Sequence, residues 1–264
     1  MQRRPSYIFE ATDEMRNPES INAIVKNRVR SNLARITTRL AEGRRRAPYL
    51  INRLIVSPLN RLFLNPLNRF KYSSCLQRSL EIGPGPAAIA GFETMNVIHT
   101  RNVTYVGDAC QHLPFSDGTF DVIYASHIIE HISWFQVEEA IKEWVRILKP
   151  GGTLEIWVPN GLKIAKAFVE AEERGLLEYQ DDGWRYSNDE RDPCKWAAGR
   201  VFSYGDGSGG DHPNWHRALF SPRYLKEVFR KANLTNVREM DKSEVRAYDH
   251  GWINLGVCGT KISE

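Results

Sequence analysis

From Ser79 onward the sequence alternates between short strand patterns and amphipathic helix patterns, and this alternation constrains the fold more than any other feature. Strands are expected at 79–82, 103–106, 121–125, 154–158, near Val237 and at 252–258, and helices at 137–148, 164–177 and 222–232. Strands that alternate with helices form a mostly parallel sheet, because each crossover returns the chain to the same strand direction. The sequence therefore predicts a doubly wound α/β sheet.

Charge divides the chain into two unlike parts. Residues 1–72 carry 15 Lys and Arg against 5 Asp and Glu, a local charge of +10, whereas residues 73–264 carry 21 against 27, a local charge of −6. We interpret residues 1–72 as a basic, helical N-terminal extension and residues 73–264 as the working domain. Within the extension, Pro58-Leu59-Asn60-Arg61 recurs as Pro66-Leu67-Asn68-Arg69, and the prolines are expected to divide this stretch into short pieces.

Several classes of protein are excluded by what the sequence lacks. No run approaches about 18 consecutive apolar residues, so no membrane-spanning helix is expected, and the first residues lack the apolar core of a signal peptide. The four cysteines are scattered without a C-x-x-C pair, which predicts neither a metal site nor a disulfide framework. A cytoplasmic location follows as the expectation, with peripheral membrane contact through the extension as one option.

A glycine-rich turn follows the first strand, in the run Leu80-Glu81-Ile82-Gly83-Pro84-Gly85. Glycines at the carboxyl end of a strand let a ligand approach the backbone, although the pattern also suits a dinucleotide fingerprint or a plain tight turn. Glu81 suits a cationic amino group better than a pyrophosphate. Asp108, which ends the next predicted strand, can accept a hydrogen bond from an adenine amino group.

Three further motifs follow in order: Leu113-Pro114-Phe115 running to Phe120-Asp121, His127 to His131 in the pattern H-x-x-E-H, and Lys149-Pro150-Gly151-Gly152. With these motifs, residues 79–159 resemble the class I S-adenosylmethionine-dependent methyltransferases, and most closely a small-molecule branch that includes enzymes associated with glycan assembly. The resemblance implies a seven-stranded, Rossmann-like sheet and S-adenosylmethionine as the cofactor. It does not extend to residues 1–72.

The resemblance also implies which residues bind the cofactor. Glu81, Gly83 and Gly85 are assigned to its amino-acid end, Asp108 and Ala109 to the adenine, and Ser126 to the neighbourhood of the sulfonium. Two positions depart from the family pattern. Ala87 replaces the third glycine, and Asn96 replaces the acid that binds the ribose hydroxyls. We favour Asn96 over Glu93 as the ribose ligand because it lies nearer the expected strand end. Only about one helical turn fits between Gly85 and Asn96.

Histidines are the candidate catalytic bases. His127 follows the fourth strand of the resembling fold, and His216 lies in the long loop ahead of the last helix, so we select these two. His131 and His212 are weaker candidates, and a structural role rivals the catalytic one at each histidine. Residues 181–220 are expected to form a lid or substrate loop. Its aromatic residues suit stacking on a sugar or aromatic acceptor, or form a small core of their own.

The sequence thus predicts methyl transfer to a hydroxyl or carboxylate of a small molecule, a sugar or a glycan intermediate. Two alternatives stay open at this stage: an NAD(P)-dependent oxidoreductase, and a degenerate, non-catalytic module that binds S-adenosylmethionine. The sequence does not define the oligomeric state.

Residues 1–72 have three interpretations: packing on a protein surface, association with an anionic membrane through the aliphatic stretch 50–70, and electrostatic binding of nucleic acid. Binding of nucleic acid is disfavoured, because the extension contains no recognisable nucleic-acid-binding motif.

Overall fold

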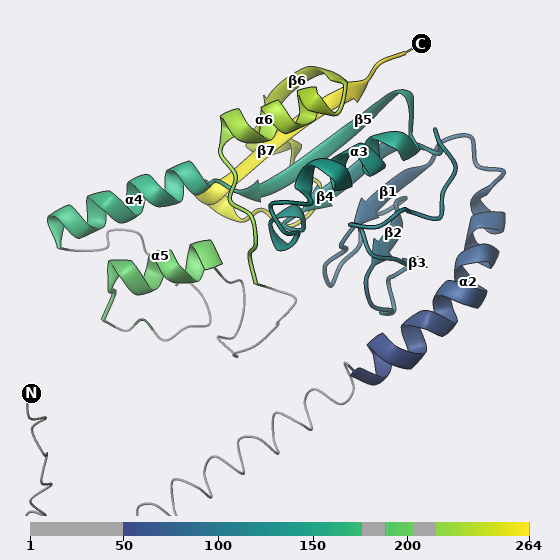
Figure 1. Cartoon of the computed structure of the whole chain (residues 1–264), viewed down its shortest axis with the longest axis horizontal. Helices are drawn as coiled ribbons and strands as arrows, with labels where there is room; N and C mark the ends of the chain where they lie inside the picture. The colour runs from purple at the N-terminus through teal and green to yellow at the C-terminus, as the bar shows by residue number, and fades with distance from the viewer. Residues whose placement is uncertain (1–49, 176–187, 189, 203–214, 264) are drawn as a thin grey trace, which may run out of the picture. The chain divides into compact units, whose positions relative to one another are not determined.

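The computed structural model describes residues 50–175, 188, 190–202 and 215–263 (Figure 1). Its strands are β1 Ser79–Ile82, β2 Glu93–Asn96, β3 Tyr105–Val106, β4 Phe120–Ser126, β5 Leu148–Pro159, β6 Leu234–Met240 and β7 Asn254–Lys261. Its α-helices are α2 Ser57–Tyr72, α3 Val137–Ile147, α4 Gly161–Arg174, α5 Pro193–Phe202 and α6 Pro222–Lys231. Four shorter helical segments are η2 Asn52–Val56, η3 Ile129–His131, η4 Lys242–Glu244 and η5 Gly251–Ile253.

The seven strands form one sheet in the order β3-β2-β1-β4-β5-β7-β6. All neighbouring strands run parallel except β7, which is antiparallel to both β5 and β6. The predicted seven-stranded, mostly parallel sheet is therefore confirmed. Strand β1 pairs with β2 on one side and with β4 on the other, so the direction of winding reverses between β1 and β4. In open α/β sheets, ligands bind outside the carboxyl ends of the strands at such a reversal.

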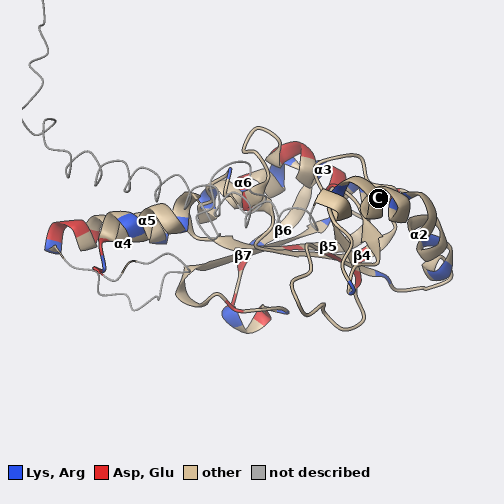
Figure 2. Cartoon of the chain, turned by 90° about the horizontal axis from the view of Figure 1, so that it is seen from below, with Lys and Arg blue, Asp and Glu red and all other residues tan. Residues whose placement is uncertain are grey.

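The two faces of the sheet are covered differently. Helices α3 and α6 lie together on one face (Figures 1 and 2), where they bury a continuous apolar core with the sheet. The segment between β6 and β7 crosses the other face. There the guanidinium of Arg246 donates to the Glu155 carboxylate at 2.6 and 2.8 Å, and the Ala247 amide donates to the Tyr124 hydroxyl at 3.3 Å.

Most predicted elements appear with shifted ends. Helix α6 begins at Pro222, as predicted, and Ser221 caps it with an Oγ that accepts a hydrogen bond from the Tyr224 amide. Strand β2 was not among the predicted strands, because its sequence, Glu-Thr-Met-Asn, lacks a β-branched apolar run. Residues 83–92 contain no helix, as the short span to Asn96 predicts. The predicted loop 181–220 contains helix α5, so describing the whole stretch as a loop was wrong.

Helix α2 corrects the expectation that prolines divide residues 58–70 into short pieces. It runs unbroken from Ser57 to Tyr72. Pro58 lies in the first turn, where a backbone amide has no intrahelical partner to lose. Pro66 lies inside the helix and removes the donor for the Leu62 carbonyl. Residue 62 is exposed, so that carbonyl is on the side of the helix that water reaches.

Side-chain amides attach α2 to the edge strand β3. The Asn65 Nδ2 donates to the Val106 carbonyl at 2.9 Å, and the Val106 amide donates to Asn65 Oδ1 at 3.0 Å. Asn68 Nδ2 donates to the Thr104 carbonyl at 2.7 Å. The buried Asn65 side chain thus bonds the edge strand as a neighbouring peptide would, and it satisfies backbone groups that an uncovered edge leaves open.

Residues 57–72 therefore pack with the sheet. The chain divides into compact units at Met1–Asn52 and Arg53–Glu264. The first 49 residues of the predicted helical extension lie outside the described residues. Among the described helices, none has the length and apolar content needed to cross a bilayer.

We predict that Asn65→Ala lowers the free energy of unfolding by about 2 kcal/mol, because it leaves a buried amide and a buried carbonyl of Val106 without their partner. Asn60→Ala is the control: Asn60 lies on the same helix, in the first copy of the Pro-Leu-Asn-Arg repeat, and is only half-buried. Urea unfolding of both variants measures the difference. Equal losses in the two variants would show that the amide pairing with β3 adds no stability.

Candidate functional site

The predicted cofactor residues come from four strands but lie at one edge of the sheet. Gly83 follows β1, Asn96 ends β2, Asp108 follows β3, and Ser126 ends β4. Strands β1 to β4 are mutually parallel, so their carboxyl ends share an edge. The structure therefore brings together residues that are up to 43 positions apart in the sequence.

The two glycines after β1 have different surroundings. Gly83 has a φ of +72°, its amide donates to the Met95 carbonyl at 2.8 Å, and a Cβ at this position would lie 2.0 Å from Cδ1 of Ile128. A side chain here would be strained and would displace Ile128. A Cβ on Gly85 would meet nothing within 4 Å. Gly85 thus leaves open space at the sheet edge, and the departure at Ala87 lies in the same exposed turn.

Glu81 is buried in β1 and tethers the turn that follows it. Its Oε2 accepts a hydrogen bond from the Ile89 amide at 2.9 Å. Burial raises the pKa of Glu81, and the bond from Ile89 opposes that rise in part. The carboxylate therefore fixes the backbone of the glycine-rich turn, a role that the motif alone did not indicate.

The structure separates the two candidates for the ribose ligand. Glu93 lies at the amino end of β2, where the Arg78 guanidinium donates to both carboxylate oxygens at 2.7 and 2.8 Å and the Tyr105 hydroxyl donates at 2.5 Å. Asn96 lies at the carboxyl end of the same strand. Its Oδ1 accepts from the Val97 amide at 2.7 Å. Of the two, only Asn96 is at the edge that carries the other candidates.

Asp108 begins a turn that is also bonded by Trp144 of α3. The Cys110 amide donates to Asp108 Oδ1 at 3.0 Å, and the Trp144 indole donates to the Ala109 carbonyl at 3.0 Å. Burial, together with the charge of Asp108, raises the pKa of the Cys110 thiol to about 12, so this cysteine stays a thiol. The turn is thus fixed by contacts from α3 as well as from its own backbone.

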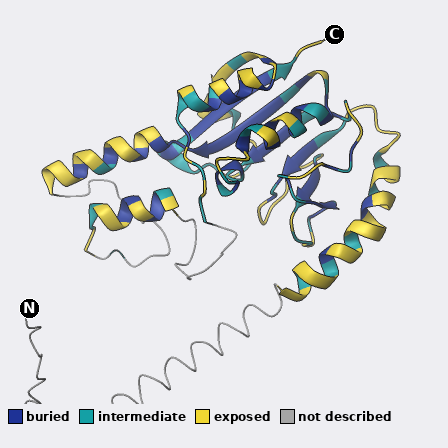
Figure 3. Ribbon diagram, viewed as in Figure 1, coloured by how far each residue is buried: buried dark blue, intermediate teal, exposed yellow. Residues whose placement is uncertain are grey.

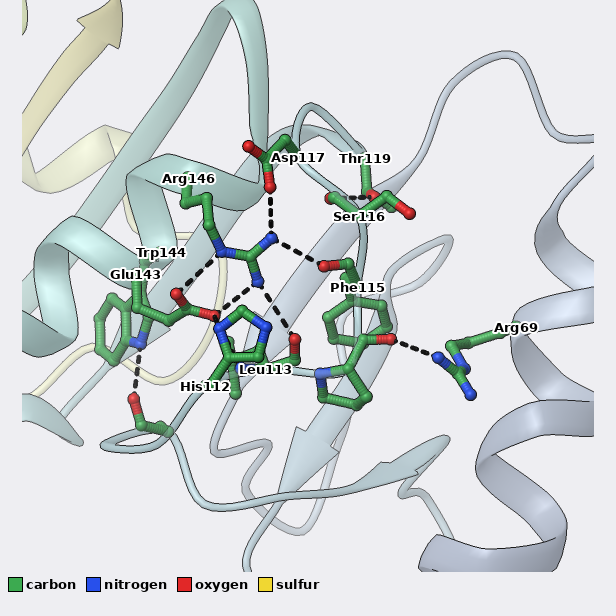
Figure 4. Close-up of polar contacts among 12 residues, drawn as sticks. Arg69, His112, Leu113, Phe115, Ser116, Asp117, Thr119, Glu143, Trp144 and Arg146 are labelled. Atoms are coloured by element: carbon green, nitrogen blue, oxygen red, sulfur yellow. Dashed lines mark hydrogen bonds and ion pairs between the residues drawn. The ribbon is translucent and has the colours of Figure 1, made fainter.

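Arg146, on α3, organises the Leu113-Pro114-Phe115 motif (Figure 4). Its guanidinium donates to the Phe115 carbonyl at 2.9 Å, the Leu113 carbonyl at 3.1 Å and Asp117 at 2.6 Å. Glu143 pairs with the same guanidinium at 2.6 Å and accepts from the Leu113 amide at 2.7 Å. The motif therefore acts by holding the loop after Asp108. Sequence reasoning missed Arg146 and Glu143, whose i, i+3 spacing on a helix was the available signal.

His127 follows β4 in a backbone conformation that is uncommon for a residue with a side chain. Its φ is +53°, and its amide donates to the Trp157 carbonyl at 2.8 Å. Nδ1 lies 3.2 Å from Oε1 of Glu130, and Nε2 lies 2.9 Å from Oδ1 of Asn254. Asp249 accepts from the Asn254 amide nitrogen at 2.8 Å, which turns Oδ1 toward the histidine. Both ring nitrogens of His127 therefore face an oxygen atom of a neighbouring side chain.

Glu130 is the carboxylate that faces Nδ1 of His127. Its side chain is 2% exposed. Burial alone would raise its pKa, but the hydrogen bond from His127 and the nearby histidines lower the pKa to about 2. Its backbone carbonyl accepts from the amides of Arg217 and Ala218 at 2.7 and 3.1 Å. Glu130 therefore links the end of β4 to the segment that leads into α6.

His216 joins this cluster from a distant part of the chain. Its ring centroid is 5.0 Å from that of His131, whose Nδ1 lies 3.3 Å from the Trp215 carbonyl. Burial lowers the pKa of His216 to about 4, which leaves the ring neutral at pH 7. The His250 ring stacks 3.7 Å from that of His127, and burial lowers its pKa to about 3. His250 was not predicted from the sequence.

The cluster also has the spacing of a metal site, although the sequence predicts none. Glu130, His131 and His216 each offer one ligand atom, and these atoms lie within 4.8 Å of one another. Asp211 and His212, whose side chains could also ligate a metal, lie outside the described residues.

The aromatic residues of 181–220 divide between core and surface. Trp196 is 2% exposed and packs in a small core with α4 and Ile253, and its ring lies parallel to that of Trp252 at 6.2 Å. Phe202 is exposed. Trp196 therefore has the structural role, whereas Trp184, Tyr186 and Tyr204 lie outside the described residues.

We predict that Glu130→Gln lowers the free energy of unfolding by about 3 kcal/mol, because it removes a buried carboxylate whose pKa is held at about 2 by the hydrogen bond from His127 and by the nearby histidines. The control is Glu138→Gln, which removes a carboxylate from the exposed pair with Lys231 and should change stability little. Chemical denaturation at pH 7 compares them. If the two variants lose the same small amount, the Glu130 carboxylate does not stabilise the histidine cluster.

We also predict that stability falls on acidification below about pH 6.5. The unfolded chain protonates His216 near its ordinary pKa of 6.5, whereas the folded chain resists protonation until about pH 4. More protons bind to the unfolded state across this window, so lowering the pH favours unfolding, by about 3 kcal/mol at its acid end. Thermal melts at pH 7 and pH 4.5 measure the loss, and His216→Asn should make it smaller. An unchanged loss in that variant would contradict the assignment.

Comparisons with known proteins agree with the site. A family model described as a methyltransferase domain matches residues 79–156. A sterol 4-C-methyltransferase of Caenorhabditis elegans is 34% identical over 76 residues, which cover 29% of this chain and 22% of that protein. A ubiquinone/menaquinone biosynthesis C-methyltransferase of Haemophilus ducreyi is 40% identical over 53 residues, which cover 20% of each chain. The match thus spans about a fifth of these curated relatives.

Solved structures resemble this chain over a longer stretch but at lower similarity. A methyltransferase from Archaeoglobus fulgidus has 14% identity and a TM-score of 0.41, with 79% of this chain and 94% of that chain covered. The family assignment rests instead on the matched domain, which begins at β1 and ends within β5 and so includes every predicted cofactor residue. Residues 79–156 thus match a methyltransferase domain, which supports the predicted resemblance to the class I S-adenosylmethionine-dependent methyltransferases.

Proposed function

We propose that this chain transfers a methyl group from S-adenosylmethionine to a hydroxyl or carboxylate of a small molecule, a class that includes sugars and glycan intermediates. One observation carries the proposal. In a stretch that matches a methyltransferase domain, the candidate cofactor residues lie at one sheet edge, and a buried histidine cluster follows directly after β4. The relatives named above are C-methyltransferases, and the cluster supports an acceptor that loses a proton.

The residues at the sheet edge fit S-adenosylmethionine. Gly85 leaves open space where the amino-acid end would approach the backbone. The Asn96 amide nitrogen can donate to ribose oxygens while its Oδ1 accepts from Val97. Asp108 supplies an acceptor for the adenine amino group. The neutral amide at Asn96 replaces a charge-assisted bond with an ordinary one, so we expect weaker binding of the cofactor than an acid would give.

In the histidine cluster, the two predicted catalytic residues, His127 and His216, have different roles. When bound, S-adenosylmethionine supplies an electrophilic methyl group on a sulfonium and departs as the neutral thioether. His216, neutral at pH 7, receives the proton of an acceptor hydroxyl as the new oxygen–methyl bond forms. His127 has both nitrogens engaged, so it positions the cluster and is not a base. A carboxylate acceptor would not need a base.

The alternative of an NAD(P)-dependent oxidoreductase is not favoured. The family model that matches β1 to β5 is a methyltransferase domain, and the turn after β1 runs through residues 83–92 without the helix whose N-terminus binds a pyrophosphate in dinucleotide-binding proteins.

We predict that Asp108→Ala weakens binding of S-adenosylhomocysteine by about 1–3 kcal/mol, the scale of a buried polar group left without its partner. Asp117→Ala is the control, because Asp117 is an exposed acid on the same loop that contacts Arg146 instead. Isothermal titration calorimetry compares the variants, and a titration with NAD tests the alternative. Normal affinity in Asp108→Ala would show that the adenine does not bind at Asp108. Binding of NAD alone would overturn the proposed function.

Transfer itself is tested with S-adenosylmethionine carrying a labelled methyl group and a fractionated metabolite extract. The proposal expects label in a small-molecule fraction, with the chemical stability of the product distinguishing an ether from an ester. Under the mechanism above, His216→Asn lowers kcat for a hydroxyl acceptor without changing cofactor affinity. Binding of S-adenosylhomocysteine without any transfer would favour a non-catalytic module.

A further inference from the structure

Helix α2 reverses the usual arrangement of polar and apolar side chains. Its buried residues are Ser57 and Asn65. Its exposed side carries four large apolar residues spaced four, four and three positions apart, so they share one face of the helix. These are Leu59, Phe63, Leu67 and Phe70, with side chains 51%, 60%, 63% and 82% exposed. We call these four residues the apolar face of α2.

The helix is attached so that this face stays directed away from the sheet. Three polar contacts anchor the opposite side: Asn65 to Val106, Asn68 to Thr104, and the Ser57 hydroxyl accepting from the His99 amide at 3.0 Å. Rotation that buried the apolar face would break all three contacts. Figure 3 shows the result, with the exposed side of α2 continuous along the helix and its buried side toward β3.

The charges around this face all have one sign. Residues 53–72 include Arg53, Arg61, Arg69 and Lys71 and contain no acidic residue, and Figure 2 shows basic but no acidic positions on α2. Arg69 donates to the Pro114 carbonyl at 2.8 Å, and Lys71 Nζ lies 5.1 Å from the centre of the Tyr72 ring. Residues 53, 61 and 71 are all exposed. Long basic side chains beside an apolar face are typical of helices that lie in the interface of an anionic membrane.

The basic residues also indicate whether a membrane or a second copy of the chain covers the apolar face of α2. Apposition of two apolar faces of α2 would bring two purely basic rims together, and like charges repel. An anionic surface instead complements the rim. The sequence immediately before the described residues adds to this charge, with 11 Lys and Arg against 5 Asp and Glu in residues 1–49.

We propose that the apolar face of α2 inserts into the interface of an anionic lipid membrane and holds the methyltransferase domain against it. Leu59, Phe63, Leu67 and Phe70 enter the boundary between headgroups and acyl chains, while Arg53, Arg61 and Lys71 contact lipid phosphates. The proposal does not depend on methyl transfer, since it concerns a surface outside the sheet edge that carries the cofactor residues.

Co-sedimentation of the full chain with lipid vesicles tests this proposal. We expect binding to vesicles of phosphatidylcholine with phosphatidylglycerol, at least tenfold weaker binding to phosphatidylcholine alone, and a decline as salt is raised. Leu67→Glu/Phe70→Glu should weaken binding to the anionic vesicles at least tenfold. Circular dichroism and S-adenosylhomocysteine affinity confirm that this variant is folded.

The matched control is Leu162→Glu/Val169→Glu, which places the same two charges on exposed apolar positions of α4, 47% and 51% exposed. This variant should bind the vesicles like the unaltered chain. Three results would overturn the proposal: no binding to anionic vesicles, equal binding by Leu67→Glu/Phe70→Glu and the unaltered chain, or a dimer in solution that the same two substitutions dissociate. Equal loss in the control variant would also overturn it, because charge alone would then explain the effect.

Discussion

The parallel pairing of β1 with both β2 and β4 is the constraint on which the rest of this structure depends. Register places Ile82 beside Met95 on one side and beside Ala125 on the other, so the residues that follow each strand emerge at one edge. Every candidate ligand of the cofactor is held at this edge by backbone geometry. The surrounding side chains then stabilise the turns: Glu81 bonds Ile89, and Arg146 bonds the carbonyls after Asp108.

A second feature is the buried charge directly beyond that edge. The hydrogen bond from His127 and the nearby histidines hold the pKa of Glu130 at about 2, and the neutral rings of His216 and His250 lie around the pair. The strained backbone at His127 persists because contacts from β5, η3 and β7 fix it together. The same contacts join the end of β4 to the segment before α6. The candidate site is therefore assembled from parts of the chain about 90 to 120 residues apart, a span that only the sheet bridges.

The limits of prediction from sequence follow from the range of the interactions involved. Strands β1, β4 and β5 and helices α3 and α6 were predictable because each buries a local periodic pattern. The common location of the residues that follow each strand was predictable, because the strands were expected to be parallel. The side-chain contacts of His127 were not, because they involve Asn254, which is 127 positions away, and the orientation that Asp249 gives to its amide. Neither contact leaves a periodic signal.

Helix α2 shows a different reason for the limit. An apolar stripe is ordinarily assigned to the interior, because burial of apolar surface drives folding. In α2 the buried side is instead the one that carries asparagines, since a two-residue edge strand such as β3 offers unpaired backbone groups that only a polar side chain can satisfy. Once hydrogen bonding has fixed which side faces the sheet, the apolar stripe has no protein surface left to cover among the described residues. The stripe is therefore the surface of α2 that stays open to a partner outside the sheet.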